Sequence, residues 1–352
     1  MKVRKFLLPL LFGFGILFAK PTVYILATGG TIAGAGSSTE KTASSYEAGK
    51  VLIQTILQAL PKQEIAKYAK LKSEQVLQKG SQDLTPQDWI IIAKRVNDLL
   101  KQRDVDGIVI THGTDTIEET SMFLQLVIKS DKPVVLVGAM RPSTAISADG
   151  PKNLFDGIVL ASSKEARGQG VMVVANSNIL SASDITKTNP VHVDTFKPAN
   201  IGILGYMWNN KPYFLRISSQ LHTTKSQFDI SKISSLPRVD ILYGYAGMDE
   251  RAIEASIASG TKGIVFAGVG NGNISSSVEK ALSQASAKGI KVVRAGRMIS
   301  GPITQWGEVN DEQLGFITSW WHTPQAARII LMLALQSKIT DNAKIQELML
   351  KY

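Results

Sequence analysis

Two short glycine-threonine turns carry the residue types needed to attack a carbonyl group. Residues 27–34 (ATGGTIAG) follow the apolar run 23–26, and residues 111–116 (THGTDT) follow the apolar run 107–110. Each turn offers threonine hydroxyls and clustered backbone N–H groups, which are a nucleophile and the donors for an oxyanion. Because each turn stands at the expected carboxyl end of a strand, the pair predicts one ligand-binding edge of an open α/β sheet.

Thr31 is the candidate nucleophile of the first turn. It follows Gly29 and Gly30, which permit a tight backbone and close approach of a substrate. An alcohol becomes nucleophilic at neutral pH only when a base or a charged partner activates it. The alternative is that Thr31 simply caps a turn; the motif alone balances the two interpretations, and the second turn favours the chemical one.

The second turn offers a hydroxyl and a carboxylate side by side, at Thr114 and Asp115. Asp115 can hold an ammonium group and can also cap a helix that begins near Thr116. A cationic partner is needed near Thr114, and Lys187 is a candidate, although spacing alone does not distinguish it among 39 basic residues. His112, at a strand end, is expected to be a structural hydrogen-bonding residue and not a general base.

Three further polar segments are weaker candidates. Tyr46 lies in a polar loop, where it could act from a lid or cover an apolar patch, and the residues alone favour the second interpretation. Residues 80–83 (GSQD) form a third polar turn. Residues 268–273 superficially resemble a nucleotide loop, but Asn273 stands where a glycine is required and the Gly-Lys of a phosphate loop is absent. Nucleotide binding is therefore excluded there.

The elements that must position these residues alternate between apolar runs and helical patterns. Residues 84–101 predict a helix with Thr85 as its N-cap, Pro86 in its first turn and Asp88 complementing the helix dipole. Further helices are expected over 275–288 and 324–335. The expected strands, mostly continuous apolar runs typical of strands covered on both faces, are 23–27, 107–111, 133–137, 171–174, 239–243, 263–267 and 291–294.

This alternation predicts an α/β fold in two domains. The N-terminal catalytic domain, residues 20–216, is expected to be the larger, with a doubly wound and mostly parallel sheet. Residues 217–237 are polar and rich in serine, threonine and lysine, which indicates a linker. Residues 238–352 are then a smaller, flavodoxin-like α/β domain.

Residues 1–19 are typical of a secretory signal peptide. Three basic residues precede the apolar stretch 6–18, and Ala19 is a suitable last residue before cleavage. Leu17 stands where a small residue is usual, so an uncleaved anchor or a buried first strand is the alternative, although the stretch is shorter than the roughly 20 residues of a membrane span. The chain has no cysteine, which excludes disulfides and thiol catalysis. Its net charge of +10, without a long basic run, predicts no nucleic-acid surface.

Taken together, these residues resemble the bacterial type II L-asparaginases over nearly all of residues 21–352. The resemblance rests on residues 28–33 (TGGTIA) and 107–116 (GIVITHGTDT), which occur in this order. Supporting segments are residues 80–83, 138–142, 147–150, 186–189 and 268–273. The expected export matches the periplasmic branch of that family.

The resemblance implies roles for individual residues. Thr31 would be the nucleophile that takes the aspartyl group, Tyr46 its proton-relay partner on a mobile lid, and Thr114, Asp115 and Lys187 a supporting triad. The implied substrate-binding residues are Gly30, Ser81, Gln82, Thr114, Asp115 and Ala139, with Asn273 and Glu308 supplied by a neighbouring subunit. It further implies a homotetramer built as a dimer of dimers, without a metal, a cofactor, bound nucleic acid or stable membrane association after signal cleavage.

The implied reaction is the hydrolysis of L-asparagine to L-aspartate and ammonia through a threonine-linked aspartyl acyl-enzyme. Glu308 favours asparagine, because dual glutaminase-asparaginases commonly have serine there, and minor glutaminase activity is still expected. Besides such a dual enzyme, one alternative is a periplasmic amino-acid-binding protein, which would use Ser81, Gln82 and Asp115 but need neither Thr31 nor Lys187.

Another alternative, an amidase acting on a misacylated tRNA, predicts a nucleic-acid surface that the sequence lacks.

The chain departs from the family in two places. The loop between Thr31 and Tyr46 is slightly longer than in familiar members, and residues 319–324, with Trp320 and Trp321, are unusually aromatic.

Overall fold

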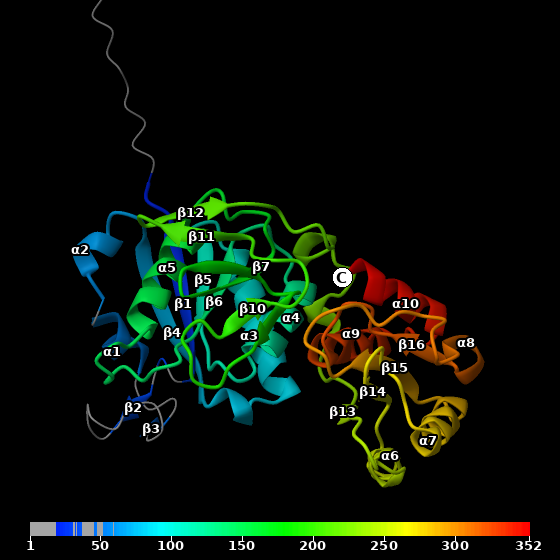
Figure 1. The fold of residues 1–352 in the computed structure, drawn as a ribbon. Helices are drawn as coiled ribbons and strands as arrows, with labels where there is room; N and C mark the ends of the chain where they lie inside the picture. The colour runs from blue at the N-terminus through cyan, green and yellow to red at the C-terminus, as the bar shows by residue number, and fades with distance from the viewer. Residues whose placement is uncertain (1–18, 31, 33, 37–45, 48–51, 59) are drawn as a thin grey trace, which may run out of the picture.

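An eight-stranded sheet forms the centre of the N-terminal domain (Figure 1). The computed structural model describes residues 19–30, 32, 34–36, 46–47, 52–58 and 60–352. Five neighbouring strands run parallel, in the sheet order β4 (Lys70–Lys79), β1 (Thr22–Gly29), β5 (Gly107–Thr111), β6 (Val134–Val137) and β7 (Val171–Ala175). Antiparallel strands extend the sheet beyond β7: β8 (Asn178–Ser181), β11 (Gly205–Trp208) and β12 (Lys211–Phe214). The carboxyl ends of the parallel strands therefore share one edge.

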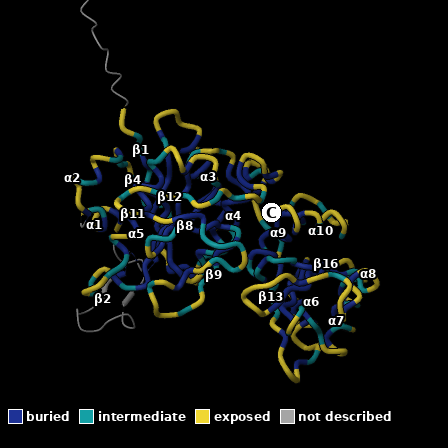
Figure 2. Tube along the Cα trace, turned by 45° about the horizontal axis from the view of Figure 1, so that its top comes forward, coloured by how far each residue is buried: buried dark blue, intermediate teal, exposed yellow. Residues whose placement is uncertain are grey.

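Helices cover both faces of this sheet. Successive side chains of its inner strands point to opposite sides, so an apolar strand makes both faces apolar and both must be covered. Leu26 of β1 packs on the side of α3 and α4, whereas Ile25 packs on the side of α5, α1 and α2. β5, β6 and β7 are buried along their whole length. In Figure 2, buried residues gather at the centre of the N-terminal domain and exposed residues lie along its outside. The helices are α1 (Ile53–Gln58), α2 (Lys62–Ile65), α3 (Pro86–Leu100), α4 (Ile117–Val127) and α5 (Gly150–Ser162).

The smaller C-terminal domain is a second α/β layer around a four-stranded parallel sheet. Its strands follow chain order: β13 (Val239–Tyr243), β14 (Gly263–Gly268), β15 (Lys291–Gly296) and β16 (Phe316–Thr318). One face packs against α6 (Arg251–Ala258) and α7 (Ser276–Ala287), and the other against α9 (Pro324–Gln336) and α10 (Asn342–Lys351); the short α8 (Asp311–Leu314) precedes β16. The predicted fold class, two α/β domains with the larger one first, is confirmed.

Every strand and helix expected from the sequence is present. α3 begins as predicted, with the Thr85 side chain accepting the Asp88 N–H and the Asp88 carboxylate accepting the Thr85 N–H. β4 and the antiparallel strands of the large sheet were not predicted. β4 is a polar, partly exposed edge strand, and the others are only four residues long, so neither forms the continuous apolar run that a buried strand requires.

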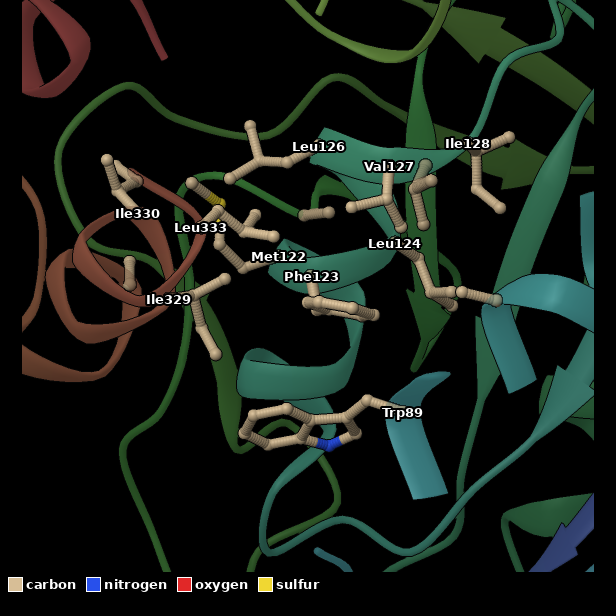
Figure 3. Packing of buried hydrophobic residues seen from close by; sticks show 14 of the residues in the cluster. Trp89, Met122, Phe123, Leu124, Leu126, Val127, Ile128, Ile329, Ile330 and Leu333 are labelled. Atoms are coloured by element: carbon tan, nitrogen blue, oxygen red, sulfur yellow. The ribbon is translucent and has the colours of Figure 1, made fainter. Parts of the chain in front are cut away.

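One helix of the C-terminal domain, α9, also packs against the N-terminal domain. Figure 3 shows Met122 and Phe123 of α4 beside Ile329 and Leu333 of α9. At the rim of this contact, Arg328 of α9 pairs with Glu119 of α4 at 3.0 Å. A single apolar cluster therefore continues from one domain into the other.

The expected linker, residues 217–237, packs against the N-terminal domain. It contains the short 3-10 helices η3 (Thr223–Lys225) and η4 (Ile230–Lys232). Phe228 is buried in the cluster shared by both domains, and the Ser226 hydroxyl donates to the carbonyl of Leu126 at 2.5 Å. The precise bounds of the domains stay a prediction.

Candidate active site

Three polar turns meet at the carboxyl ends of β4, β1 and β5. These strands are neighbours in the sheet, so the turns that follow them are neighbours as well. The Thr28 hydroxyl donates to the carbonyl of Thr111 at 2.8 Å, which joins the first turn to the second. The Gly30 N–H donates to the carbonyl of Lys79 at 3.1 Å, which joins the first turn to the third. The predicted meeting of the first two turns at one edge of the sheet is confirmed, and ligand binding at that edge stays a prediction.

Glycines allow the turns to touch. Gly30 has a φ of +80°, and a Cβ there would lie 2.3 Å from the backbone nitrogen of Gly113. A Cβ at Gly113 would in turn lie 2.5 Å from the Ser81 hydroxyl oxygen. Gly30, Gly113 and Ser81 therefore form a stack with no room for a larger residue at either glycine.

Lys187 reaches this stack from outside the parallel strands. It ends β9 (Ile185–Lys187), which pairs antiparallel with β10 (Phe196–Pro198). Its Nζ donates to Thr114 Oγ1 at 2.9 Å and to Asp115 Oδ1 at 2.6 Å. Thr114 is buried and the Lys187 side chain is only 18% exposed, whereas Asp115 is 58% exposed and open to a ligand. The structure thus brings together three of the predicted residues, including the lysine that spacing could not single out.

Ser81 connects the second and third turns. Its hydroxyl accepts the Asp115 N–H at 3.2 Å, and its carbonyl accepts the Thr116 hydroxyl at 2.8 Å. Ser81 is buried and Gln82 exposed within η2 (Ser81–Asp83). Ala139 is buried just beyond the end of β6, the next strand along the same edge. Ser81 and Ala139 thus follow β4 and β6, which flank β1 and β5 in the sheet, and the Thr114–Lys187 cluster (Thr114, Asp115 and Lys187) includes the turn after β5.

His112 has the surroundings of a structural residue. It is fully buried, and its Nδ1 lies 2.7 Å from the carbonyl oxygen of Gly113, to which the neutral ring donates. Burial lowers the pKa of His112 to about 4, only partly opposed by that bond. A neutral, buried ring at this position fixes the backbone of the turn.

Thr31 and Tyr46 are the other two predicted catalytic residues. Thr31 lies outside the described residues; its chain neighbour Gly30 contacts the second turn at Gly113. The backbone of Tyr46 belongs to β3 (Tyr46–Glu47), which pairs antiparallel with β2 (Ala35–Gly36) and sets Tyr46 opposite Gly36. The roles of both residues stay predictions.

Asn273 and Glu308 lie together in the C-terminal domain. The Asn273 amide donates to Glu308 Oε2 at 3.0 Å. Within the described part of the chain, no hydrogen bond or ion pair joins either residue to the Thr114–Lys187 cluster of the same chain. Their action at a neighbouring subunit stays a prediction.

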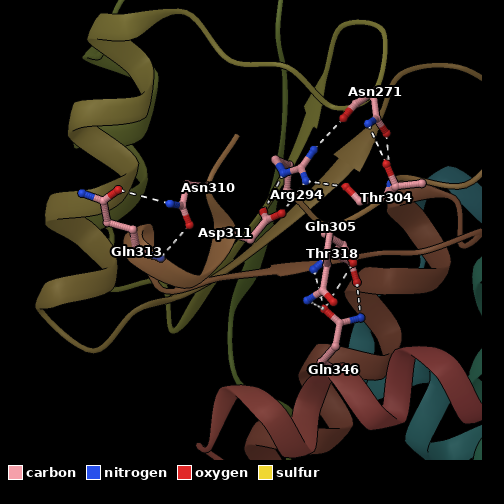
Figure 4. Close-up of polar contacts among 9 residues, drawn as sticks. All are labelled: Asn271, Arg294, Thr304, Gln305, Asn310, Asp311, Gln313, Thr318 and Gln346. Carbon is pink, nitrogen blue, oxygen red and sulfur yellow. Dashed lines mark hydrogen bonds and ion pairs between the residues drawn. The ribbon is translucent and has the colours of Figure 1, made fainter. Parts of the chain in front are cut away.

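A buried arginine fixes the two loops that carry this pair (Figure 4). Arg294 forms a two-point ion pair with Asp311, at 2.7 and 2.6 Å, and both side chains are 1% exposed. Its remaining N–H groups donate to the carbonyls of Asn271 and Thr304, at 2.5 and 2.8 Å. Arg294 therefore ties together the loop before Asn273 and the loop before Glu308, a role that the sequence analysis missed because nothing in the sequence separates Arg294 from the other basic residues.

Glu118 was also missed. It lies in the first turn of α4 and accepts the backbone N–H of Lys187 at 3.2 Å. From sequence alone, an acidic residue at the start of a helix is interpreted as a partner of the helix dipole, so the contact of Glu118 with Lys187 was not predicted. Groups of three or more His, Asp or Glu residues that could hold a metal are absent from the described residues.

The fold and the site define a two-domain α/β enzyme with a hydroxyl–lysine–carboxylate cluster at a sheet edge. A family model described as "Asparaginase, N-terminal" matches residues 22–219, and one described as "Glutaminase/Asparaginase C-terminal domain" matches residues 238–349. The chain belongs to the asparaginase family and is an amidohydrolase of that family.

Individual relatives agree over nearly the full length. L-asparaginase 2 of Escherichia coli is 46% identical over 344 residues, which cover 97% of each chain. A protein of Haemophilus influenzae named "Probable L-asparaginase periplasmic" is 44% identical and covers 99% of each chain. Among solved structures, a crystal structure titled "Probable Cytoplasmic L-asparaginase" from Campylobacter jejuni superimposes with a TM-score of 0.90 at 46% identity, covering 95% of this chain and 100% of that one. The predicted relationship to bacterial L-asparaginases is confirmed.

Proposed function

We propose that this enzyme hydrolyses L-asparagine to L-aspartate and ammonia through an acyl-enzyme on Thr31. The observation that carries the proposal is the contact of Lys187 Nζ with both Thr114 and Asp115, in a turn that touches Gly30. Gly30 immediately precedes Thr31 in the sequence, so the proposed nucleophile follows a residue that touches the turn of Thr114 and Asp115.

The chemistry is a double displacement. The Thr31 oxygen attacks the side-chain amide carbon, the C–N bond breaks, and ammonia leaves with the proton from the hydroxyl. Thr114 accepts a hydrogen bond from Lys187, so its own O–H is free to point toward the reacting groups. Backbone donors near Gly30 and Thr114 hold the oxyanion, each contributing about 3–4 kcal/mol to the transition state. Water then attacks the ester, releasing aspartate and restoring Thr31.

Substrate recognition follows from the residues around this cluster. The exposed Asp115 carboxylate takes the α-ammonium group, Ser81 and Gln82 contact the α-carboxylate, and the Ala139 backbone faces the amide. Asn273 and Glu308 complete the site from a neighbouring subunit of a homotetramer, which favours asparagine over glutamine. A dual glutaminase-asparaginase is the second candidate, because the matching C-terminal family description names both activities.

We place the enzyme in the periplasm on the strength of residues 1–19, whose basic start and apolar stretch favour export. One of the relatives is named periplasmic, whereas the solved structure is called cytoplasmic, so the two names point to different compartments. The proposal therefore rests on residues 1–19. None of the described helices is long and apolar enough to cross a bilayer.

Trapping the intermediate tests the reaction. The enzyme is mixed briefly with L-asparagine, quenched in acid and digested with trypsin, and we expect an aspartyl adduct on the peptide that contains Thr31. Thr31→Ala should lose the adduct and roughly 10⁴-fold or more in kcat while still binding asparagine. The control Thr55→Ala changes an exposed threonine of α1 and should keep both.

The same experiment separates the alternatives. L-glutamine should give a glutamyl adduct that forms more slowly; adducts that form equally fast with both amides indicate a dual enzyme. A binding protein would release no ammonia. Normal turnover by Thr31→Ala contradicts the assigned nucleophile.

A further inference from the structure

Glu118 connects the helix after the second turn to the strand that carries Lys187. Its Oε2 accepts the Lys187 backbone N–H at 3.2 Å, and the Thr186 side chain donates a second hydrogen bond to the same carboxylate. At the other end of the lysine, Nζ bonds Thr114 and Asp115. Lys187 is thus held at its backbone and at its tip by one continuous segment, residues 114–118.

We propose that Glu118 is a positioning residue, whose ionised carboxylate holds β9 so that the Lys187 ammonium reaches Thr114 and Asp115 together. A carboxylate accepts both the Thr186 and the Lys187 bonds, whereas a protonated carboxyl group loses part of its acceptor capacity. Loss of either bond loosens the end of β9 that carries Lys187, although β9 stays paired with β10, and the lysine then spends less time at the 2.9 Å contact with Thr114. This inference rests on the proposed function, because it concerns how Lys187 is presented to the reaction.

Burial and the charged groups around Glu118 together set the pKa of its carboxyl group. Glu119 is adjacent on α4, Lys187 lies on β9, and Tyr243 of β13 faces both glutamates from the C-terminal domain. Arg328 of α9 pairs with Glu119 rather than with Glu118. Burial raises the pKa of Glu118 to about 7, against the bonds from Thr186 and Lys187. Below that pH the carboxylate becomes protonated and its hold on β9 weakens.

The test is the pH profile of kcat for wild type and Glu118→Gln. Wild type should lose activity as the pH falls through about 7. Glutamine has nearly the same shape but only one acceptor oxygen, so the variant should lack that limb and turn over at the low-pH rate of wild type, about tenfold below the wild-type plateau. KM should change little, because Glu118 does not belong to the substrate-binding set. A role in folding alone would lower the yield or Tm without moving the profile.

Two more variants make the outcome decisive. Glu119→Gln removes the neighbouring carboxylate without touching β9 and should keep the limb, moved somewhat below pH 7 because the charge of Glu119 raises the pKa of Glu118. The inference is overturned if Glu118→Gln keeps the limb or if Glu119→Gln loses it. Lys187→Ala separates this result from the larger proposal: normal turnover there removes Lys187 from the reaction altogether, whereas an inactive Lys187→Ala beside an unaltered Glu118→Gln profile removes only the role of Glu118.

Discussion

Two buried histidines, His112 and His322, each make the folded protein less stable in acid. Burial lowers the pKa of each to about 4, from an ordinary value of 6.5. Between these two pH values each histidine is protonated in the unfolded chain but neutral in the folded one. The free energy of unfolding therefore falls as the pH drops through this window. The fall is about 3 kcal/mol for each histidine.

Replacing His322 by glutamine should remove one of these two losses. His322 lies in the C-terminal domain, outside the active-site turns of the N-terminal domain, and its Nε2 donates to the carbonyl of Met349 at 3.0 Å, a bond that a glutamine amide can also make. Denaturant unfolding of His322→Gln at pH 7 and pH 4 should show a fall smaller by about 3 kcal/mol than in wild type. The exposed His192, changed to glutamine, is the control and should behave as wild type. An unchanged fall in His322→Gln would show that His322 does not titrate on unfolding.

At this scale the sequence reveals residues whose neighbours in the chain form a motif. Thr114 and Asp115 stand out because a strand precedes them and a glycine adjoins them. Lys187 becomes distinct only once β9 places it 2.9 Å from Thr114. Glu118 and Arg294 have no local signal at all, because their partners lie on other elements and an isolated charge in sequence resembles a solvated one.

At the scale of elements, the start of α3 supports the third turn of the active site. Asp88 accepts hydrogen bonds from the backbone of Thr85 and ion-pairs with Lys79 at 2.9 Å. Residues 80–83, which include Ser81 and Gln82, form the short segment between those two anchors. The helix cap therefore also fixes a turn of the active site.

Thr85→Ala should cost about 1 kcal/mol of unfolding free energy, as measured by denaturant titration, because it removes the side-chain cap of α3. Ser275→Ala offers a matched control, since Ser275 is the N-cap of α7 without a side-chain cap bond and its loss should be near zero. Equal losses in the two variants would mean that the capping bond of Thr85 contributes nothing.

Parallel strands were predicted well because burial on both faces leaves uninterrupted apolar runs, as in residues 107–111. β4 escaped prediction for the opposite reason. Its sequence, KLKSEQVLQK, is polar because it forms the sheet edge, where one row of its backbone groups and much of its side-chain surface are open. The strand that leads to Ser81 is thus the one whose sequence least resembles a strand.

At the scale of the whole molecule, α9 joins the two domains by packing against both. Its side chains pack under β14 and β15 of its own domain and against α4 of the other, within one apolar cluster (Figure 3). A helix shared in this way cannot leave one domain without uncovering the other. We therefore expect the domains to unfold together, although family models match them separately.

Leu333→Ala tests this coupling. Leu333 is fully buried in α9, and its truncation should cost about 2–5 kcal/mol. Hydrogen exchange followed by mass spectrometry, at increasing denaturant, should show peptides from β1 and β14 losing protection by the same amount, because the cavity weakens a core that both strands need. Loss of protection confined to β14 would instead define two independent folding units. The stability of the Thr114–Lys187 cluster would then depend on the domain that carries Asn273 and Glu308 only through assembly with another subunit.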